Sequence, residues 1–407
     1  MAGESSRGLA PLVDAYDHFA MSTNDDPFDE YNELRSRCPV FRTEAHGGHY
    51  VALSYDDVIE VSSKPAEFSS VSLTIPDPPV MYVLPPLTSD PPEHQRYRGL
   101  LAAEFNPGRV RKFQDAIRDQ AVELVDAFIG SGAADLATDL IFPLTARATA
   151  LFLGIPKEKI LTFQKHALEL NTVIYAEPER FTEVRQKVLD FFAKHVQDRR
   201  ECPADDFASH LFGATFEGGE VPDDLSVLLH TLLNGAAGET TASGGVGMFH
   251  IIAQRPDLRR RLLDDRELWP TAVEEFIRII SPIPGFARTA VGANRTVGDV
   301  VVPRGDKVWL DYLAANHDPA AWDRPDEVVL DRKPNRHVAF GAGIHKCPGA
   351  PLARIEMQVM LEQVLTRLPD FKVSDWSVTG LLPSATRLRP HLPVTFTPGP
   401  RLSDRSE

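Results

Sequence analysis

Cysteine is scarce in this 407-residue chain. The three cysteines, Cys38, Cys202 and Cys347, lie far apart and form no CxxC pair. Such spacing offers no disulfide framework, so we expect a chain suited to a reducing cytoplasm. Basic residues are also fewer than acidic ones: the chain has 43 Lys and Arg and 58 Asp and Glu, which gives a net charge of −15. That balance argues against general nucleic-acid binding.

Leader-like and membrane-like segments are missing as well. Residues 1–30 are polar, small and acidic, without the apolar centre of a signal peptide or an anchor. No run elsewhere is expected to reach membrane length, because Asn234, Gly235 and Glu239 interrupt the most apolar helix. No fused flavin or iron–sulfur module is recognisable. We therefore expect a soluble, cytoplasmic monomer that does not bind a membrane.

The expected secondary structure is mainly helical with a smaller β-rich part, an α+β arrangement. Apolar content of 43% and charged content of 25% are ordinary for a globular protein. No internal repeat or low-complexity linker divides the chain, so we expect one domain over 1–407. Its expected parts are a loose arm over 1–26, β-rich segments at about 38–70, 285–336 and 370–397, and helical segments at about 90–282 and 350–368.

The segment 71–86 combines five prolines with many apolar residues. An exposed loop is the ordinary interpretation of so many prolines, but its apolar members, which include Val80, Met81 and Tyr82, are unusual for one. Apolar loops often line ligand sites. We therefore expect this segment to line a ligand site.

Cys347 lies in the run FGAGIHKCPG over residues 340–349. The run is rich in glycine, which lets a flat ligand approach the backbone closely. Pro348 is expected at the first position of the following helix, because proline is favoured there. Cys347 would then lie at a helix N-terminus, where the dipole lowers the pKa of a thiol. A buried, inert cysteine is the commoner role of a single cysteine.

The pattern Phe-x-x-Gly-x-His-x-Cys-x-Gly resembles the haem-ligand loop of the cytochrome P450 family. The resemblance implies the P450 fold, with haem b (iron protoporphyrin IX) between the long central helix and the Cys loop. It also implies that Cys347 is the thiolate ligand of the iron, with Phe340 and Gly341 beside the haem. Thiolate ligation favours O–O cleavage.

His94 and Arg98 are four residues apart, so both project from one face of a helix. Taken alone, such a pair is typical of a solvated surface. Within DPPEHQRYR (90–98), however, the pair resembles the family's helix that binds a haem propionate. By the same resemblance Arg288 and His345 are further donors to the two haem carboxylates, which need neutralisation when buried.

The long helix expected over about 223–253 contains glycines at its middle, each costing about 1 kcal/mol relative to alanine. Close helix packing is one explanation for them. Thr240 can bond back to the carbonyl of Ala236 and bend the turn. By resemblance Glu239 and Thr240 are the catalytic acid–alcohol pair that delivers protons. Ala237 stands where the family usually has glycine, and its methyl could narrow the oxygen groove.

Glu275 and Arg278 place opposite charges three residues apart in an apolar helix. Such a pair is often a surface contact of little value, but its position before the Cys run matches the family's structural ion pair. A third basic member is expected nearby. The aligned position holds Glu327, while Arg324 and Arg332 are close in sequence, so the third member stays open.

The motifs occur in the family's order, and the resemblance implies a monooxygenase that inserts one atom of O₂ into an apolar small molecule. By family analogy residues 71–86 and 281–286 line the substrate pocket. They carry only one charge, Asp77, and no arginine is placed to hold a substrate carboxylate. We therefore favour a neutral terpenoid, steroid-like or polyketide-type substrate. Electrons would come from a separate ferredoxin and an NAD(P)H-dependent ferredoxin reductase. An H₂O₂-driven peroxygenase and a non-catalytic haem-binding sensor are the alternatives.

A basic cluster is expected near the thiolate side of the haem. It is either an ordinary solvated surface or a docking face that steers an acidic ferredoxin. Its members are Arg109, Arg111, Lys112, Arg332, Lys333, Arg336 and Lys346.

Overall fold

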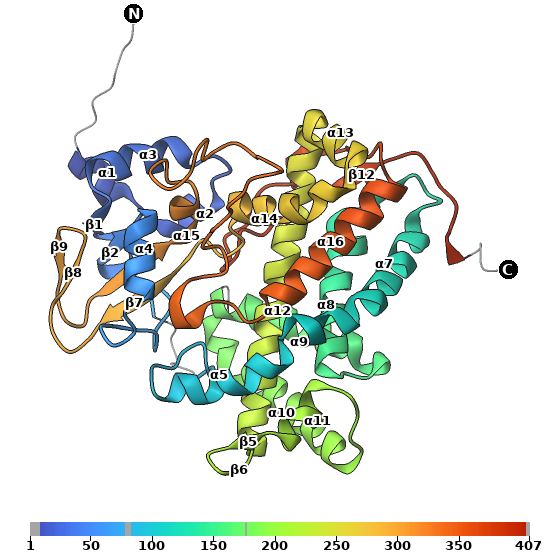
Figure 1. The fold of residues 1–407 in the computed structure, drawn as a ribbon, viewed down its shortest axis with the longest axis horizontal. Helices are drawn as coiled ribbons and strands as arrows, with labels where there is room; N and C mark the ends of the chain where they lie inside the picture. The colour runs from blue at the N-terminus through green and yellow to red at the C-terminus, as the bar shows by residue number, and fades with distance from the viewer. Residues whose placement is uncertain (1–8, 78–82, 176, 404–407) are drawn as a thin grey trace, which may run out of the picture.

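The computed structural model describes residues 9–77, 83–175 and 177–403, and helices make up most of them (Figure 1). The longest helix, α12 (Asp223–Gln254), is buried along much of its length. Several helices pack directly on α12, and four of them make the most extensive contacts. These are α8 (Phe142–Leu153), α10 (Phe181–Glu201), α14 (Trp269–Ile280) and α16 (Ala350–Arg367). The mainly helical architecture predicted from the sequence is confirmed.

The remaining α-helices are all shorter than α12. They are α1 (Leu9–Ala15), α2 (His18–Thr23), α3 (Phe28–Arg37), α4 (Tyr55–Ser62), α5 (Glu93–Glu104), α6 (Pro107–Val110), α7 (Gln114–Phe128), α9 (Ile160–Tyr175), α11 (Phe207–Gly213), α13 (Pro256–Asp264) and α15 (Tyr312–Asn316). Several of these helices have a side-chain N-cap. Ser54 accepts a hydrogen bond from the N–H of Asp57 at the start of α4, and Asp311 accepts one from the N–H of Ala314 at the start of α15.

The N-terminal arm that we expected to be loose over 1–26 is helical where it is described, in α1 and α2. Tyr16, between these helices, is fully buried, and its hydroxyl donates to Asp311 Oδ2 at 2.7 Å. Tyr31 donates to the same oxygen at 3.0 Å. These buried contacts order the arm against the sheet, and the short polar sequence gave no sign of them.

The β-rich part is built on a five-stranded sheet with the order β1-β2-β10-β7-β3. Its strands are β1 (Val40–Thr43), β2 (His49–Ala52), β10 (Lys307–Asp311), β7 (Gly285–Ala290) and β3 (Phe68–Ser69). The β2–β10 pair is parallel and the other pairs are antiparallel. The sheet therefore joins segments more than 200 residues apart, with Val51 opposite Trp309.

Smaller strand groups lie outside this sheet. They are β11 (Lys372–Val373) with β12 (Pro393–Thr395) and β4 (Ala133–Asp135), β5 (Thr215–Phe216) with β6 (Gly219–Glu220), and β8 (Arg295–Val297) with β9 (Val300–Val302). Three of these short strands, β4, β5 and β6, fall within the stretch expected to be wholly helical. They are two or three residues long, too short to show a period-2 pattern.

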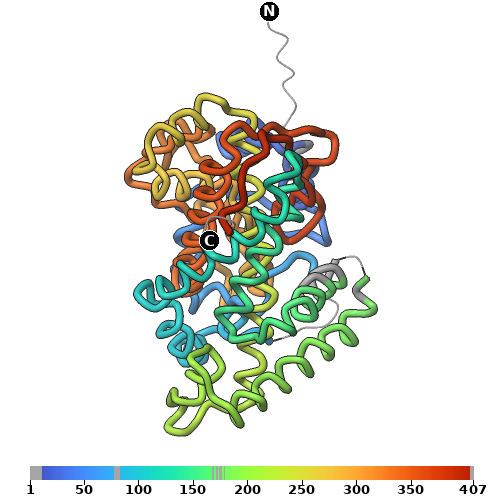
Figure 2. The backbone as a smooth tube through the Cα atoms, turned by 90° about the vertical axis from the view of Figure 1, so that its right-hand side faces the viewer, coloured from blue at the N-terminus to red at the C-terminus, as the bar shows by residue number. Residues whose placement is uncertain are grey.

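The sheet and the N-terminal helices lie on one side of the molecule, and the bundle around α12 lies on the other (Figure 1). The side view shows α9 and α10, in green, projecting from the bundle (Figure 2). The chain between α15 and α16 connects the sheet side to the bundle. The three cysteines, which lie on different parts of this framework, are free thiols, as their spacing predicted.

One described stretch, Leu136–Leu153, is long and apolar enough to cross a membrane by length and composition alone. We expected no run of that length, and this expectation was wrong. Within the protein 61% of the stretch is buried, and its α8 portion packs on α7 and α12. A core helix of a globular protein has these same properties.

Candidate active site

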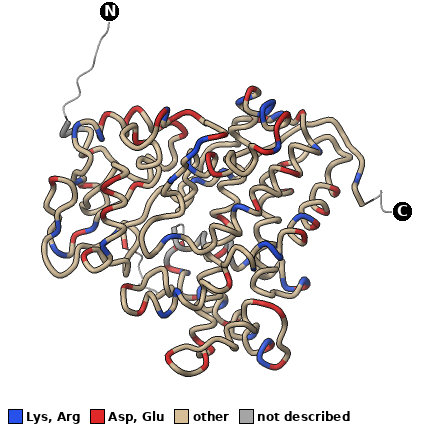
Figure 3. The backbone as a smooth tube through the Cα atoms, in the orientation of Figure 1, with Lys and Arg blue, Asp and Glu red and all other residues tan. Residues whose placement is uncertain are grey.

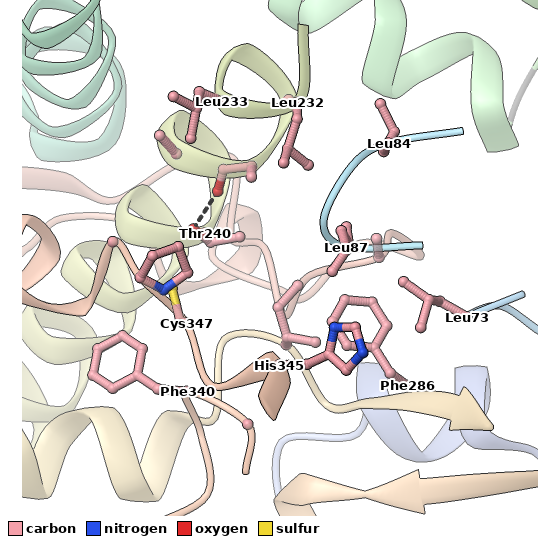
Figure 4. Close-up of a pocket in the computed structure, with 18 of the residues that line it drawn as sticks. Leu73, Leu84, Leu87, Leu232, Leu233, Thr240, Phe286, Phe340, His345 and Cys347 are labelled. Carbon is pink, nitrogen blue, oxygen red and sulfur yellow. Dashed lines mark hydrogen bonds between the residues drawn. The ribbon is translucent and has the colours of Figure 1, made fainter. Parts of the chain in front are cut away.

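A cavity of about 390 Å³ lies where α12 faces the loop before α16 (Figure 4). Its walls are mostly apolar, as is usual for small-molecule sites. Residues from four parts of the chain are labelled around it: Leu73, Leu84 and Leu87 from the segment after β3, Leu232, Leu233 and Thr240 from α12, Phe286 from β7, and Phe340, His345 and Cys347 from the loop before α16.

The backbone of the loop before α16 is fixed by short contacts. The N–H of Cys347 donates to the carbonyl of Phe340 at 2.8 Å. Gly341 and Gly343 both have positive φ, at 69° and 64°. A Cβ on Gly343 would also lie 2.0 Å from the carbonyl oxygen of Ser62, so only glycine fits there. The glycines predicted to shape this loop therefore do so through turn geometry and close packing.

The helix after Cys347 begins at Ala350, and its proline in the first turn is Pro351. Pro348, which we expected at the first helical position, lies two residues before it. The N–H groups of Gly349 and Ala350 and the charge of Arg98 favour the thiolate of Cys347, but burial outweighs them and raises the pKa of the thiol above its ordinary value. Desolvation by the surrounding protein thus opposes the lowering that the helix end was expected to produce.

Four basic side chains gather at one wall of the cavity. The rings of His94 and His345 lie 4.4 Å apart, and His94 and Arg288 are buried. Arg98 donates to the carbonyl of Lys346 at 2.5 Å. By strict hydrogen-bond geometry, Nε2 of His345 and both ring nitrogens of His94 lack a partner among the described residues, although the backbone of Ile344 approaches the His94 ring.

The close packing of these basic side chains disfavours the protonated form of the two histidines. Burial, together with Arg288, His94 and Arg98, lowers the pKa of His345 to about 3. Burial and Arg98 also lower the pKa of His94. Within the described chain, no carboxylate forms an ion pair with any of the four. This cationic wall, with two guanidinium groups and two neutral imidazoles that are each buried or half-buried, fits a ligand that carries carboxylates.

The site therefore fits a haem at two independent points. The cationic wall can receive two propionates, and the Cys347 thiol lies in the same cavity as a possible iron ligand. Phe340 and Gly341 also line this cavity, where the resemblance places them. The guanidinium of Arg354 lies over the ring of Phe340 at 4.8 Å, which holds that ring in place.

On α12, the hydroxyl of Thr240 donates to the carbonyl of Ala236 at 2.8 Å, the contact predicted from the sequence (Figure 4). Glu239 Oε1 accepts from the hydroxyls of Ser384 at 2.9 Å and Thr386 at 2.7 Å. Ala237 also lines the cavity. The two hydroxyl partners of Glu239 come from a segment about 145 residues away, so no sequence pattern pointed to them.

The glycines of α12 divide into two groups. A Cβ on Gly245 would lie 2.7 Å from Met360 Sδ of α16, and one on Gly244 would lie 3.2 Å from Met357 Sδ. At Gly235 and Gly238 an added Cβ would meet no atom within 4 Å. Close packing thus explains the later pair, whereas the earlier pair lies in the part of α12 that faces the cavity.

The pair formed by Glu275 and Arg278 is fully buried and bidentate, with both N–O distances at 2.9 Å. Arg332 is its third basic member, because its Nε lies 3.0 Å from each oxygen of Glu275. Glu327 contributes only its backbone carbonyl, which accepts from Arg278 at 3.1 Å. The third basic member of the ion-pair network, which the sequence alignment left open, is therefore Arg332.

The two segments expected to line the pocket do so. Leu73 and Leu84 of the first segment and Ile283 and Phe286 of the second are among the lining residues. Val80, Met81 and Tyr82, also expected there, lie outside the described residues.

Two charged residues in the cavity wall were not predicted. Arg185 of α10, which the sequence did not single out as an arginine placed to hold a substrate carboxylate, lines the cavity and has no ion-pair partner within the described part of the chain. Glu356 of α16 is fully buried; burial raises its pKa well above the ordinary value, and Oε2 has no described partner. Arg185 lies on a charge-rich helix, and Glu356 lies on a helix that also carries Arg354, Gln358 and Glu362, so neither differs in sequence from a surface residue.

The predicted basic cluster is only partly available for docking. Arg109 pairs with Glu104 at 2.8 Å, and Arg332 belongs to the Glu275 network. The remaining five are exposed: Arg111, Lys112, Lys333, Arg336 and Lys346. Acidic and basic residues are interspersed over the rest of the chain (Figure 3).

Comparison with known proteins agrees with this site. A sequence profile described as Cytochrome P450 matches residues 160–377. The chain is 32% identical to Cytochrome P450 130 of Mycobacterium tuberculosis, over 86% of this chain and 90% of that one. It is 32% identical to a Steroid C26-monooxygenase of Mycolicibacterium smegmatis, over 90% and 92%.

Solved structures show the same relationship. CYP109E1 from Bacillus megaterium in complex with testosterone superposes with a TM-score of 0.83 at 28% identity, covering 91% of this chain and 99% of that one. A mutant of P450 EryK in complex with erythromycin B gives 0.83 at 27% identity, covering 92% and 97%. The chain belongs to the cytochrome P450 family. It is accordingly a monooxygenase, an oxidoreductase that incorporates oxygen into its substrate.

Proposed function

We propose that this protein binds haem b (iron protoporphyrin IX) through Cys347 and inserts one oxygen atom of O₂ into an apolar small molecule. The observation that carries the proposal is a single cavity that contains both the Cys347 thiol and the cationic wall, whose members form no ion pair with a carboxylate of the described chain. Bound there, a thiolate-ligated haem supplies O₂ chemistry, because the thiolate pushes electron density toward the iron.

The cationic wall binds and orients the cofactor. Arg98 and Arg288 offer guanidinium groups suited to carboxylates, and His94 and His345 add ring N–H donors. Gly341 leaves space for the flat ring, and Phe340 gives it an apolar neighbour.

Thr240 and Glu239 hold the protons that the reaction needs. The Thr240 hydroxyl, bonded to the Ala236 carbonyl, keeps its oxygen lone pairs free to accept a hydrogen bond from the cavity side. The Glu239 side chain, held by Ser384 and Thr386, is the adjacent group that takes up a proton from solvent and, as the carboxylic acid, passes it on to Thr240 as the Thr240 hydroxyl gives up its own.

The substrate binds between the leucine-rich segment after β3 and α12. These apolar walls favour a terpenoid, steroid-like or polyketide-type scaffold. The relatives named for steroid oxidation and the neighbour bound to erythromycin B support that class. Arg185 adds a cationic point at α10, suited to a substrate that also carries an acceptor or a carboxylate.

Electrons come from a separate ferredoxin and its NAD(P)H-dependent reductase. The exposed Arg111, Lys112 and Lys346 support docking of an acidic partner at the thiolate side. Arg111 and Lys112 directly follow α6, and Lys346 lies shortly before α16. Because α6 and α16 contact each other, these three side chains lie in the same region of the surface, where they can attract an acidic partner.

An optical titration of the ferric protein tests the proposal. The ligands are matched neutral and carboxylate forms of terpenoids, steroids and macrolides. A saturable shift of the Soret band to shorter wavelength with one class identifies the scaffold.

Turnover of that scaffold with ferredoxin, reductase, NAD(P)H and isotopically labelled O₂ must then give a product with one labelled oxygen. Product formed only with H₂O₂ would indicate a peroxygenase. A saturable shift with no product from either oxidant would indicate a sensor.

A further inference from the structure

Three histidines and an aspartate gather where α2 meets the β1–β2 hairpin, apart from the residues that line the active-site cavity. Asp17 and His18 begin α2, and His46 and His49 belong to the hairpin. The ring centroids of His18 lie 5.1 Å from His46 and 5.4 Å from His49. Asp17, His18 and His46 each offer a ligand atom, and these atoms all lie within 4.8 Å of one another.

Two of these imidazoles are held with an unused lone pair in the protein interior. His18 Nε2 lies 3.0 Å from the carbonyl oxygen of Ile75, so this nitrogen carries the proton and Nδ1 carries the lone pair. His49 Nδ1 lies 3.2 Å from the carbonyl oxygen of Ala45, which leaves the lone pair on Nε2. Both rings are buried, at 3% and 2% exposure, and neither lone pair has a partner in the described chain.

This arrangement is the one that metal-binding histidines adopt. A ligating imidazole usually donates its other N–H to a carbonyl or carboxylate, which fixes the ring and its tautomer. A neutral imidazole held in this way presents its free lone pair outward, away from the carbonyl, which is the form that binds a metal.

His46 contacts Asp17 from a strained backbone conformation. Its φ is 54°, in the left-handed region that few non-glycine residues adopt, and Gly47 and Gly48 follow it with positive φ. In this conformation His46 Nε2 lies 3.0 Å from Asp17 Oδ1. The side chain of His46 is 24% exposed, so the cluster is open to solvent on this side.

We propose that Asp17, His18 and His46 bind a divalent transition-metal ion of the Zn²⁺ class. Imidazole nitrogens with one carboxylate suit Zn²⁺ and its neighbours Ni²⁺ and Cu²⁺, whereas Ca²⁺ and Mg²⁺ prefer oxygen ligands alone. Zn–ligand bonds of 2.0–2.1 Å put neighbouring ligand atoms of a tetrahedral ion about 3.3 Å apart. The 3.0 Å between Asp17 Oδ1 and His46 Nε2 is close to that spacing, so the ion takes the place of the shared hydrogen.

The ion would join three parts of the N-terminal region. Asp17 and His18 belong to α2, His46 belongs to the hairpin, and the Ile75 carbonyl fixes His18 to the segment whose Leu73 and Thr74 line the cavity. Metal binding is therefore expected to stabilise the fold around these elements, in addition to the haem.

Isothermal titration of the chelator-treated holoenzyme with Zn²⁺ near neutral pH tests the site. We expect one ion per chain and a Tm that rises with free Zn²⁺ concentration. His46→Ala and Asp17→Asn should weaken binding at least 10- to 100-fold, with unchanged haem content and Soret spectrum. Since the haem is read separately, loss of this site and failure of the proposed function are distinguishable.

His391→Ala is the matched control, because His391 is an exposed histidine whose Nδ1 lies 2.8 Å from Asp135 Oδ2. This variant should bind Zn²⁺ like the wild type. Absence of stoichiometric binding in the wild type would overturn the proposal. So would binding that His46→Ala leaves intact and that Cys202→Ser, which removes an exposed thiol, abolishes.

Discussion

At the scale of single residues, Thr240 stands in the interior of α12 with its hydroxyl bonded to the Ala236 carbonyl. Replacing it by alanine removes the hydroxyl that we propose takes part in proton delivery to the cavity. Thr240→Ala should therefore keep most NAD(P)H consumption while peroxide replaces much of the product, a several-fold loss in product per NAD(P)H. Thr240→Ser, which keeps the hydroxyl, should retain most of the coupling. Equal coupling in the alanine variant and the wild type would count against the role of Thr240.

Arg185 makes a second residue-scale prediction, because it is a cation in a mostly apolar wall. A hydrogen bond to a charged group contributes about 1.5–3 kcal/mol, so Arg185→Leu should weaken binding of a carboxylate-bearing ligand about tenfold or more. Binding of the matched neutral ligand should change little. Spectral titration measures both, with Lys187→Leu, an exposed position on the same helix, as control. Equal effects on the two ligands would show that Arg185 does not face the substrate.

Glu356 gives a prediction with a pH dependence. Burial raises its pKa well above the ordinary 4.5, so the folded state holds this proton more tightly than the unfolded state. Stability from this group is therefore full below pH 4.5 and falls as the pH rises toward the folded-state pKa. Glu356→Gln removes the effect, and its Tm relative to wild type should rise between about pH 5 and pH 8. A Tm difference that stays constant over that range would contradict a buried, protonated Glu356.

At the scale of elements, α12 contains glycines with two different roles, and matched substitutions separate them. Gly238→Ala meets no atom within 4 Å and should raise the free energy of unfolding by about 1 kcal/mol through helix propensity. Gly245→Ala would place its Cβ 2.7 Å from Met360 Sδ and 3.1 Å from Ile141 Cγ2. Overpacking costs about 1–3 kcal/mol, so this variant should be the less stable of the two. Urea unfolding that shows the same change for both would contradict this division.

Element-scale features differ in how far the sequence could predict them. The Thr240–Ala236 bond is a contact between residues four apart, and helix geometry alone places it. Arg332 could not be assigned from sequence, because it approaches Glu275 from an irregular segment 57 residues away. The ordered N-terminal helices were missed for a similar reason, since Tyr16 finds Asp311 only in the folded chain.

At the scale of the whole molecule, the order of the motifs was enough to predict the fold class. It also predicted that Cys347, His94 and Arg288 share one site, and all three line the same cavity. Net electrostatic effects were not predictable in this way. The sign of the pKa shift at Cys347 depends on burial by the assembled protein, which exceeds the local helix effect. Arg185 and Glu356 were missed because only the packing of α10 and α16 against the cavity distinguishes them from surface charges.

The central claim is that Cys347 binds the haem iron as a thiolate in the cavity beneath α12. The most direct test is the carbonyl spectrum of the reduced protein, recorded for the wild type and for Cys347→His. The wild type should show the Soret band at the long wavelength characteristic of a thiolate-ligated carbonyl haem. The histidine variant should keep some haem but move that band to shorter wavelength, with loss of monooxygenation. A variant whose carbonyl spectrum matches that of the wild type would show that another residue binds the iron.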